Sequence, residues 1–291
     1  MECGAGMTLS GKCAVITGAS QGLGRAIARR FAEQGAKLCL CARHAAELEQ
    51  ATKEILRSTN CEVMSRSADI SSEPDLRGLA ALVEARFSRL DILVCNAGVH
   101  GPKGAIEQAD WGEWTQAITI NLMGTVLCCR IFLPLLRRSK RGKILLLSGG
   151  GATKPMPFLS AYAASKAAVV RFGETLAEEL RDSGVDVNCV APGALNTRML
   201  DDILDAGPAK VGQVLYEASL RQKESGGVPL EKSADLCVYL ASEAADGITG
   251  KLISAVWDAW PQLHAHRGEL ERSDIYTLRR IVPRDRGLDW G

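Results

Sequence analysis

The sequence predicts a doubly wound three-layer α/β/α sandwich with a mostly parallel seven-stranded sheet. Short apolar segments alternate with longer stretches of helical periodicity, without a linker, from Lys12 to about Trp257. This alternation is typical of a parallel sheet covered by helices on both faces. The 291 residues contain no visible repeat, and they are enough for one large α/β domain with a sizeable core.

Each predicted strand is short and rich in valine, isoleucine, leucine or cysteine, as expected for a strand buried on both faces. The expected strands are residues 13–17, 37–41, 62–66, 91–95, 143–148, 186–191 and 251–256. After Trp257 the rhythm stops, and an arginine-rich segment with Tyr276 and Trp290 follows. We therefore expect a domain over residues 1–257 and a C-terminal extension over residues 258–291.

Composition argues against several functional classes. The 35 basic and 34 acidic side chains leave a net charge of +1, which gives no global field for binding nucleic acid or an anionic membrane. No apolar run reaches the roughly 18 residues of a membrane span, and residues 1–10 lack an export signal. The prediction is a soluble, cytoplasmic protein.

The ten cysteines of the sequence lie mostly in apolar runs without a C-x-x-C pair, so we expect core residues rather than disulfides or metal ligands. His264 and His266 lack a third ligand, and no metal is expected.

The first sign of chemistry is the segment from Thr17 to Gly24, which follows the first strand and leads into a helical pattern. Gly18, Gly22 and Gly24 allow a tight turn and a close approach of the backbone to a pyrophosphate. The free amides and the positive dipole end of the following helix favour that anion. Three glycines alone can form an ordinary turn, but their position between a strand and a helix favours a dinucleotide site.

Tyr162 and Lys166 are the second sign. Residues four apart on a helix share a face, so a phenol and an ammonium group can meet in one pocket. A phenol has a pKa of about 10 and is a poor base at neutral pH, but a neighbouring cation lowers that value. Tyr162 is therefore a candidate acid or base. Alone, the pair also fits a helix with an interface tyrosine and a solvated lysine.

These segments together resemble the short-chain dehydrogenase/reductase (SDR) family in its compact single-domain branch. The matches, in the order of the family, are the glycine segment, Asn96-Ala97-Gly98, Asn121, Tyr162-Ala-Ala-Ser-Lys166, and Pro192-Gly193 with Thr197, over about residues 9–252. The resemblance implies a Rossmann-like fold, a nicotinamide cofactor, and a small carbonyl or alcohol substrate. It also implies a homodimer or homotetramer, formed through the helices around residues 111–136 and 162–181.

The resemblance also assigns roles. Lys166 binds the nicotinamide ribose, Asn121 holds a water that links Lys166 to solvent, Asp69 contacts adenine, and Thr197 holds the carboxamide. The catalytic residues expected are Asn121, Ser148, Tyr162 and Lys166. The cofactor contacts expected are Gly18, Ser20, Gln21, Gly22, Leu23, Gly24, Arg43, Asp69, Ile70, Asn96, Ala97, Gly98, Tyr162, Lys166, Pro192, Gly193 and Thr197.

The serine that holds the substrate oxygen in this family is the first departure. It usually stands about thirteen residues before the tyrosine, where this chain has Gly149, and Ser148 lies fourteen before Tyr162. A one-residue insertion between residues 150 and 158 would bring Ser148 into the site, and Ser160 is a second candidate. The alternative is that Ser148 only ends a strand and the site lacks this hydroxyl.

Cofactor preference is predicted from the end of the second strand. NAD sites place an acidic residue there to bind the ribose 2′-hydroxyl, but this chain has Ala42 followed by Arg43. Arg43 can bind a 2′-phosphate, so NADP is favoured over NAD. Arg43 also fits a solvated position at a strand end, and Gln21 stands where NADP users often carry a basic residue.

Two segments are expected near the substrate. Residues 198–229 combine apolar residues at helical spacing with Gly207-Pro208 and Ser225-Gly226-Gly227, which suits a mobile substrate loop; an ordinary surface helix fits as well. Their apolar character favours a neutral carbonyl or alcohol. The extension lacks the aspartate and paired glycines that usually end the family's chains, and it is expected to form an interface or a lid, or else a loose solvated tail.

The prediction for function is an NADP-dependent oxidoreductase that interconverts a secondary alcohol and a ketone or aldehyde, with Tyr162 as acid and base. NADP preference favours reduction. One alternative is a non-catalytic NADP-binding sensor or regulatory protein of the same fold. Another is a nucleotide-sugar epimerase or dehydratase of the family's longer branch. It fits less well because that branch has a different glycine spacing and a larger C-terminal domain.

Overall fold

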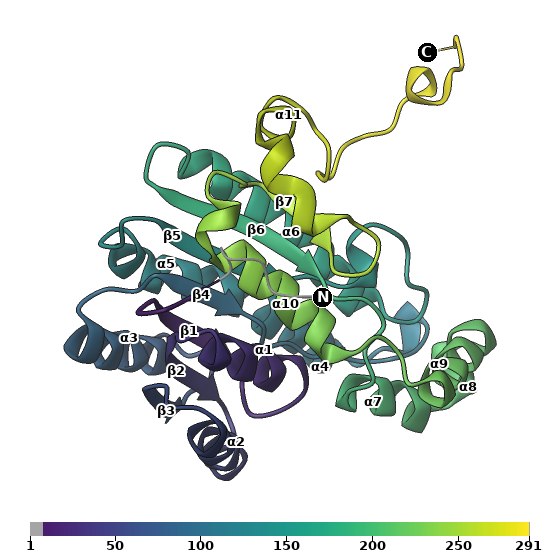
Figure 1. Ribbon diagram of the computed structural model, residues 1–291. Coiled ribbons are helices and arrows are strands. Elements are labelled where there is room, and N and C mark those ends of the chain that lie inside the picture. Colours follow the sequence, from purple (N-terminus) through teal and green to yellow (C-terminus); the bar gives the residue numbers. More distant parts are fainter. Residues whose placement is uncertain (1–7, 291) are drawn as a thin grey trace.

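Seven strands form the centre of the molecule in a computed structural model that describes residues 8–290 (Figure 1). They are β1 (Cys13–Thr17), β2 (Lys37–Ala42), β3 (Val63–Ser67), β4 (Ile92–Cys95), β5 (Gly142–Leu147), β6 (Val185–Ala191) and β7 (Lys251–Ser254). The strand order is β3-β2-β1-β4-β5-β6-β7, and every pairing is parallel. The predicted fold class is confirmed, with a sheet that is wholly rather than mostly parallel.

The predicted strands match the observed ones to within about two residues, and two differences bear on the site. β5 ends at Leu147, so Ser148 follows the strand instead of ending it. β7 ends at Ser254 because the hydroxyl of Ser254 accepts hydrogen bonds from the backbone N–H groups of Val256 and Trp257, which turns the chain.

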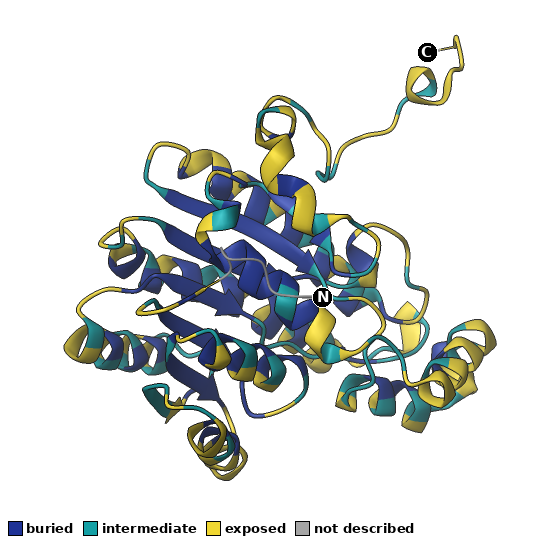
Figure 2. Cartoon of the chain, in the orientation of Figure 1, coloured by how far each residue is buried: buried dark blue, intermediate teal, exposed yellow. Residues whose placement is uncertain are grey.

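Helices cover both faces of the sheet (Figure 1). One face carries α1 (Gly22–Glu33), α2 (Ala45–Ser58) and α10 (Leu230–Ala241), and the other carries α3 (Glu73–Phe87), α5 (Gly124–Leu136) and α6 (Ser160–Glu179). Each helix turns an apolar stripe inward; in α1 the stripe is Leu23, Ile27 and Phe31, spaced four residues apart. Figure 2 shows the result, a buried sheet between two amphipathic layers.

One long helical segment departs from the sequence analysis. α4 (Trp111–Ile118), a π-helical turn (Thr119–Met123) and α5 run as one helix from Trp111 to Leu136. Contrary to expectation, this helix has the length and apolar composition to cross a membrane. Its inward residues Cys128 and Phe132 are buried against the sheet, which is the place of a core helix.

Most of the cysteines in the described residues belong to the core, as predicted. Each cysteine between residues 8 and 290 is a free thiol, and all but Cys61 are buried. Over the same part of the chain, no group of three or more His, Cys, Asp or Glu side chains is arranged to hold a metal. The prediction about an export signal falls largely on residues 1–7, which lie outside the described residues.

The first part of the C-terminal extension packs on the domain. A 3₁₀ segment (Trp260–His266) and α11 (Arg267–Arg272) follow β7, and Leu263 and Leu270 are buried in the core beside α10. The carbonyl of Tyr276 accepts a hydrogen bond from the N–H of Leu252 on the edge strand (2.8 Å). Only the chain from about residue 279 onward leads away from the body (Figure 1). The boundary expected at residue 257 is therefore not a boundary in the packing.

Candidate active site

A cavity of about 1020 Å³ opens at the carboxyl ends of the strands. It lies where the strand order reverses between β1 and β4, the usual ligand site of a doubly wound sheet. Every cofactor contact predicted from the sequence lines this cavity, as do Ser148, Tyr162 and Lys166. Asn121 is the one predicted residue that does not. The folded chain thus brings together residues that are spread from Gly18 to Thr197 in the sequence.

The glycine loop is packed too closely for larger residues. A Cβ atom on Gly24 would lie 2.2 Å from the carbonyl oxygen of Gly18. The side-chain amide of Asn96 donates hydrogen bonds to the carbonyls of Thr17 (3.0 Å) and Gly18 (3.2 Å). Asn96 therefore fixes the loop from β4, and the loop presents the first turn of α1 to the cavity. A glycine turn at the N-terminus of a helix, as here, is a typical binding place for a pyrophosphate.

The far end of the cavity carries Asp69 and Arg43. The Asp69 carboxylate accepts hydrogen bonds from the backbone N–H and the hydroxyl of Ser71. Burial opposes the effect, but these bonds lower the pKa of Asp69, so its carboxylate is ionised at neutral pH. Arg43 is exposed at the end of β2, and Ala42 before it carries no charge.

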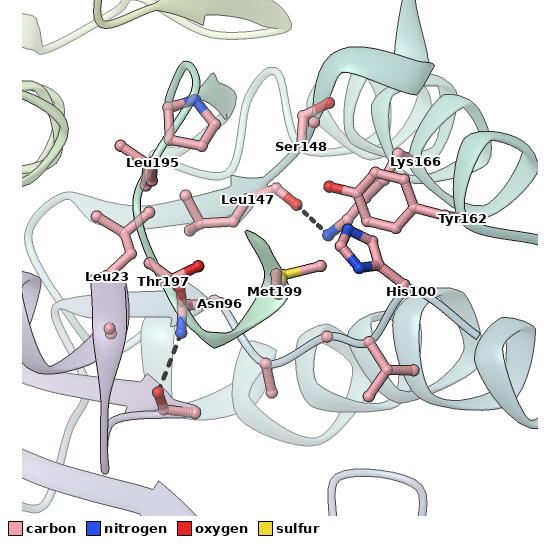
Figure 3. Close-up of a pocket in the computed structure, with 18 of the residues that line it drawn as sticks. Leu23, Asn96, His100, Leu147, Ser148, Tyr162, Lys166, Leu195, Thr197 and Met199 are labelled. Carbon is pink, nitrogen blue, oxygen red and sulfur yellow. Dashed lines mark hydrogen bonds between the residues drawn. The ribbon is translucent and has the colours of Figure 1, made fainter. Parts of the chain in front are cut away.

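Tyr162 and Lys166 lie in the same cavity on α6 (Figure 3). The Lys166 ammonium donates a hydrogen bond to the carbonyl of Leu147 (2.8 Å) and lies 5.8 Å from the centre of the Tyr162 ring. Burial lowers the pKa of Lys166 to about 8 and raises the pKa of Tyr162 to about 12. Burial is the cause of this rise in the Tyr162 pKa, and the lowering expected from Lys166 together with an oxidised nicotinamide stays a prediction.

The residue facing the Tyr162 hydroxyl is Gly149. A Cβ atom on Gly149 would lie 2.2 Å from the Tyr162 oxygen, so this position points directly at the phenol. Gly149 is extended (φ −169°, ψ 173°), and neighbouring residues of an extended chain point to opposite sides. Ser148 accordingly turns away: its hydroxyl is closed off from water and has no hydrogen-bond partner. This geometry does not support the expectation that Ser148 holds the substrate oxygen.

Ser160 does not supply that hydroxyl either. Its oxygen accepts a hydrogen bond from the indole N–H of Trp114 (3.1 Å) at the start of α6, and Ser160 does not line the cavity. Of the three readings of the serine, the geometry thus favours a site without it.

We expect Ser148→Ala to leave turnover within a few-fold of wild type and the melting temperature equal or higher. The reason is that the hydroxyl is buried without a partner, so its removal relieves a desolvation cost. Steady-state kinetics and thermal unfolding check this. A fall in kcat of about 100-fold, which is the usual effect of removing one oxyanion donor, would show that Ser148 takes part in catalysis.

Asn121 does not line the cavity but supports residues that follow the cofactor segment Asn96-Ala97-Gly98. It lies in the π-helical turn, where its side-chain oxygen accepts a hydrogen bond from the N–H of Val99 (2.8 Å) and its amide donates to the carbonyl of Val99 (2.8 Å) and to Ser165 (2.9 Å). Its side-chain donors are thus all in use. The structure gives Asn121 a positioning role for the segment after Gly98, while the water chain assigned by resemblance stays a prediction.

Three helices lie in the segment predicted as the substrate loop, namely α7 (Arg198–Ala206), α8 (Pro208–Val211) and α9 (Gln213–Ser225). Of these, α7 and α9 line one side of the cavity, and the short α8 connects them. Ile203 and Val211 pack with Leu159 and Tyr162 in a small apolar cluster. The segment predicted as the substrate loop therefore packs directly against the candidate acid Tyr162.

The sequence analysis missed His100. Its side chain is buried, lines the cavity, and contacts Tyr162 edge-on with ring centres 4.9 Å apart (Figure 3). The available signal was its place two residues after the Asn96-Ala97-Gly98 run, in a loop that follows a strand of the cofactor site.

Comparisons with known proteins agree with this geometry. The short chain dehydrogenase family matches residues 12–207. An L-fucose dehydrogenase of Oryctolagus cuniculus is 33% identical over 244 residues, which cover 82% of each chain. The structure of levodione reductase superposes with a TM-score of 0.78 at 27% identity, over 88% of this chain and 98% of the other.

L-Sorbose reductase from Gluconobacter frateurii, solved with NADPH and L-sorbose, gives a TM-score of 0.76 at 29% identity, over 85% of this chain and 96% of the other. The chain therefore belongs to the short-chain dehydrogenase/reductase family, whose members are NAD(P)-dependent oxidoreductases acting on CH–OH groups.

Proposed function

We propose that this protein is an NADP-dependent oxidoreductase that interconverts a secondary alcohol and its ketone, with Tyr162 as the proton donor and acceptor. One observation carries the proposal: Tyr162 and Lys166 lie in the same cavity as the glycine loop. The closely packed Gly18–Gly24 turn and the volume of about 1020 Å³ fit a dinucleotide beside a small substrate. When bound, that dinucleotide accepts or supplies the hydride.

The protein's own groups handle the proton. With a pKa of about 12, the Tyr162 phenol is protonated at neutral pH, so it can donate its proton to a substrate oxygen that gains negative charge. In the reverse direction the same oxygen takes the proton back. Lys166 places a positive charge 5.8 Å from the ring, which favours the phenolate left after donation. NADP preference favours reduction as the physiological direction.

The test is a panel of cyclohexanone, acetoin, ethyl acetoacetate and L-sorbose with NADPH and NADH, followed at the absorbance of the reduced nicotinamide. The proposal expects turnover of at least one ketone with NADPH preferred. Tight NADPH binding without turnover of any carbonyl or alcohol would favour a sensor instead.

Arg43 is proposed as the group that selects NADP. Arg43→Ala is expected to weaken NADPH binding by about 10- to 100-fold, the worth of a charge-assisted phosphate contact, and to leave NADH binding nearly unchanged. Fluorescence titration with both cofactors measures this. Arg57→Ala is the matched control, because it removes the same charge from an exposed position on α2 that does not line the cavity. Equal losses of affinity for NADPH and NADH would show that Arg43 does not bind the 2′-phosphate.

We also propose a homodimer or homotetramer. The long helix leaves Trp111, stacked on Trp114, and Met123 exposed on its outer side, and exposed aromatic residues with methionine are typical of protein interfaces.

A further inference from the structure

The site described above lacks a hydrogen-bond donor for the substrate oxygen at its usual place. Gly149 faces the Tyr162 phenol without a side chain, the Ser148 hydroxyl is closed off, and Ser160 binds Trp114. A second fixed donor beside the tyrosine stabilises a carbonyl oxygen that gains charge during reduction, and such donors account for a large share of catalysis. Another side chain in contact with Tyr162 must supply it, if the site has one.

His100 is in the right place. It is only 7% exposed, lines the cavity, and contacts the Tyr162 ring edge-on. Figure 3 shows its ring beside Tyr162 and Lys166 at the edge of the cavity. A substrate oxygen that reaches the Tyr162 hydroxyl therefore also comes within the neighbourhood of the imidazole.

The residues before and after His100 are held in place by contacts with neighbouring helices. Val99 is held through both its N–H and its carbonyl by the side chain of Asn121. Gly101 is wedged between α4 and α6, since a Cβ there would lie 2.6 Å from Ala117 and 3.4 Å from Ala161. A side chain between two fixed residues is preorganised, which is what a donor to a developing charge requires.

The two ring nitrogens differ. Nδ1 is closed off from water and has no hydrogen-bond partner. A buried N–H without an acceptor is rarer and more costly than a buried acceptor without a donor, so the proton of the neutral ring is expected on Nε2. Burial, together with the charges of Lys103 and Lys166, lowers the pKa of His100 to about 4, and the ring is neutral at physiological pH.

We propose that His100 donates, through Nε2–H, the hydrogen bond that holds the substrate oxygen against Tyr162, in place of the serine hydroxyl that this site lacks. The inference rests on the proposed function. It makes His100 a catalytic residue and Asn121 the residue that positions it.

The experiment compares His100→Phe, His100→Gln and His100→Asn with wild type, using the panel ketone with the highest kcat/KM. Phe keeps an aromatic ring against Tyr162 but has no nitrogen. Gln carries its amide N–H at about the reach of Nε2, whereas Asn carries it at about the reach of Nδ1. For each variant we measure kcat, KM, the Kd for NADPH and the melting temperature.

The expected result is a fall in kcat of about 100- to 1000-fold for His100→Phe, the cost of one removed oxyanion donor, with the NADPH Kd unchanged. Gln should recover at least about 10-fold of that loss, in line with one hydrogen bond of about 1.4 kcal/mol, and Asn should not. A structural role would lower the melting temperature in all three variants and would show no such rescue.

Two outcomes overturn the inference separately from the proposed function. If wild type reduces a ketone and His100→Phe does so at the same rate, His100 is not the donor while the oxidoreductase stands. If Asn recovers activity and Gln does not, the donor is Nδ1 and the assignment to Nε2 is wrong. Failure of wild type on every substrate of the panel would instead defeat the proposed function.

Discussion

Tyr162→Phe is expected to lower kcat by about 10²- to 10⁴-fold, the range that a positioned general acid or base contributes, and to leave NADPH binding nearly intact. The change removes one oxygen atom from a ring that stays packed against His100 and the apolar cluster of Ile203 and Val211. Without the phenol, the group proposed to pass a proton to the substrate oxygen is lost. Steady-state kinetics and a fluorescence titration with NADPH measure the two effects.

The melting temperature serves as the control for this variant. The core contacts of the ring are unchanged, so the variant should unfold close to the wild-type temperature. Turnover within a few-fold of wild type would mean that a different group moves the proton.

Gly149→Ala is expected to have the second-largest effect. The added Cβ would lie 2.2 Å from the Tyr162 oxygen, so the phenol has to move away from its present position. A displacement of about 1 Å at a reacting group can cost about 100-fold in rate. The backbone at Gly149 is extended, a conformation that alanine adopts freely, so the loss in kcat comes from the tyrosine and not from backbone strain.

Gly150→Ala is the matched control for Gly149→Ala. It adds the same methyl group one residue later, where the nearest atom is the Met156 sulfur at 3.9 Å. We expect Gly150→Ala to keep near wild-type turnover while Gly149→Ala loses it. Equal activities would show that Tyr162 can yield without cost, and that the close approach of Gly149 does not fix the phenol.

Local patterns in the sequence account for the parts of the fold that were predicted. The central strands are continuous apolar runs because a parallel sheet with two covered faces buries their side chains, and these runs are visible without any long-range information. Gly24 and the pair Tyr162 and Lys166 could also be predicted from the sequence, because a tight turn and a helical face are both set by residues close in sequence. All three of these residues line the cavity.

The errors came from features that spacing does not encode. The usual spacing of about thirteen residues leads to Gly149, and Ser148 was favoured only on the assumption of a one-residue insertion. In the structure β5 ends at Leu147, and Gly149 rather than Ser148 faces the phenol. His100 lies in a loop, and only the clamps on Val99 and Gly101 give its side chain a fixed direction. The hydrogen bond from Leu252 to Tyr276 that ties the extension to β7 has no local signal at all.

The central claim is that Tyr162, Lys166 and a dinucleotide share one cavity at the edge of the sheet. A crystal structure of the protein with NADPH tests it most directly. The account predicts the pyrophosphate at the Gly18–Gly24 turn, with the nicotinamide beside Tyr162 and the Lys166 ammonium near its ribose. A dinucleotide bound elsewhere, or a Tyr162 hydroxyl turned away from the nicotinamide, would contradict it.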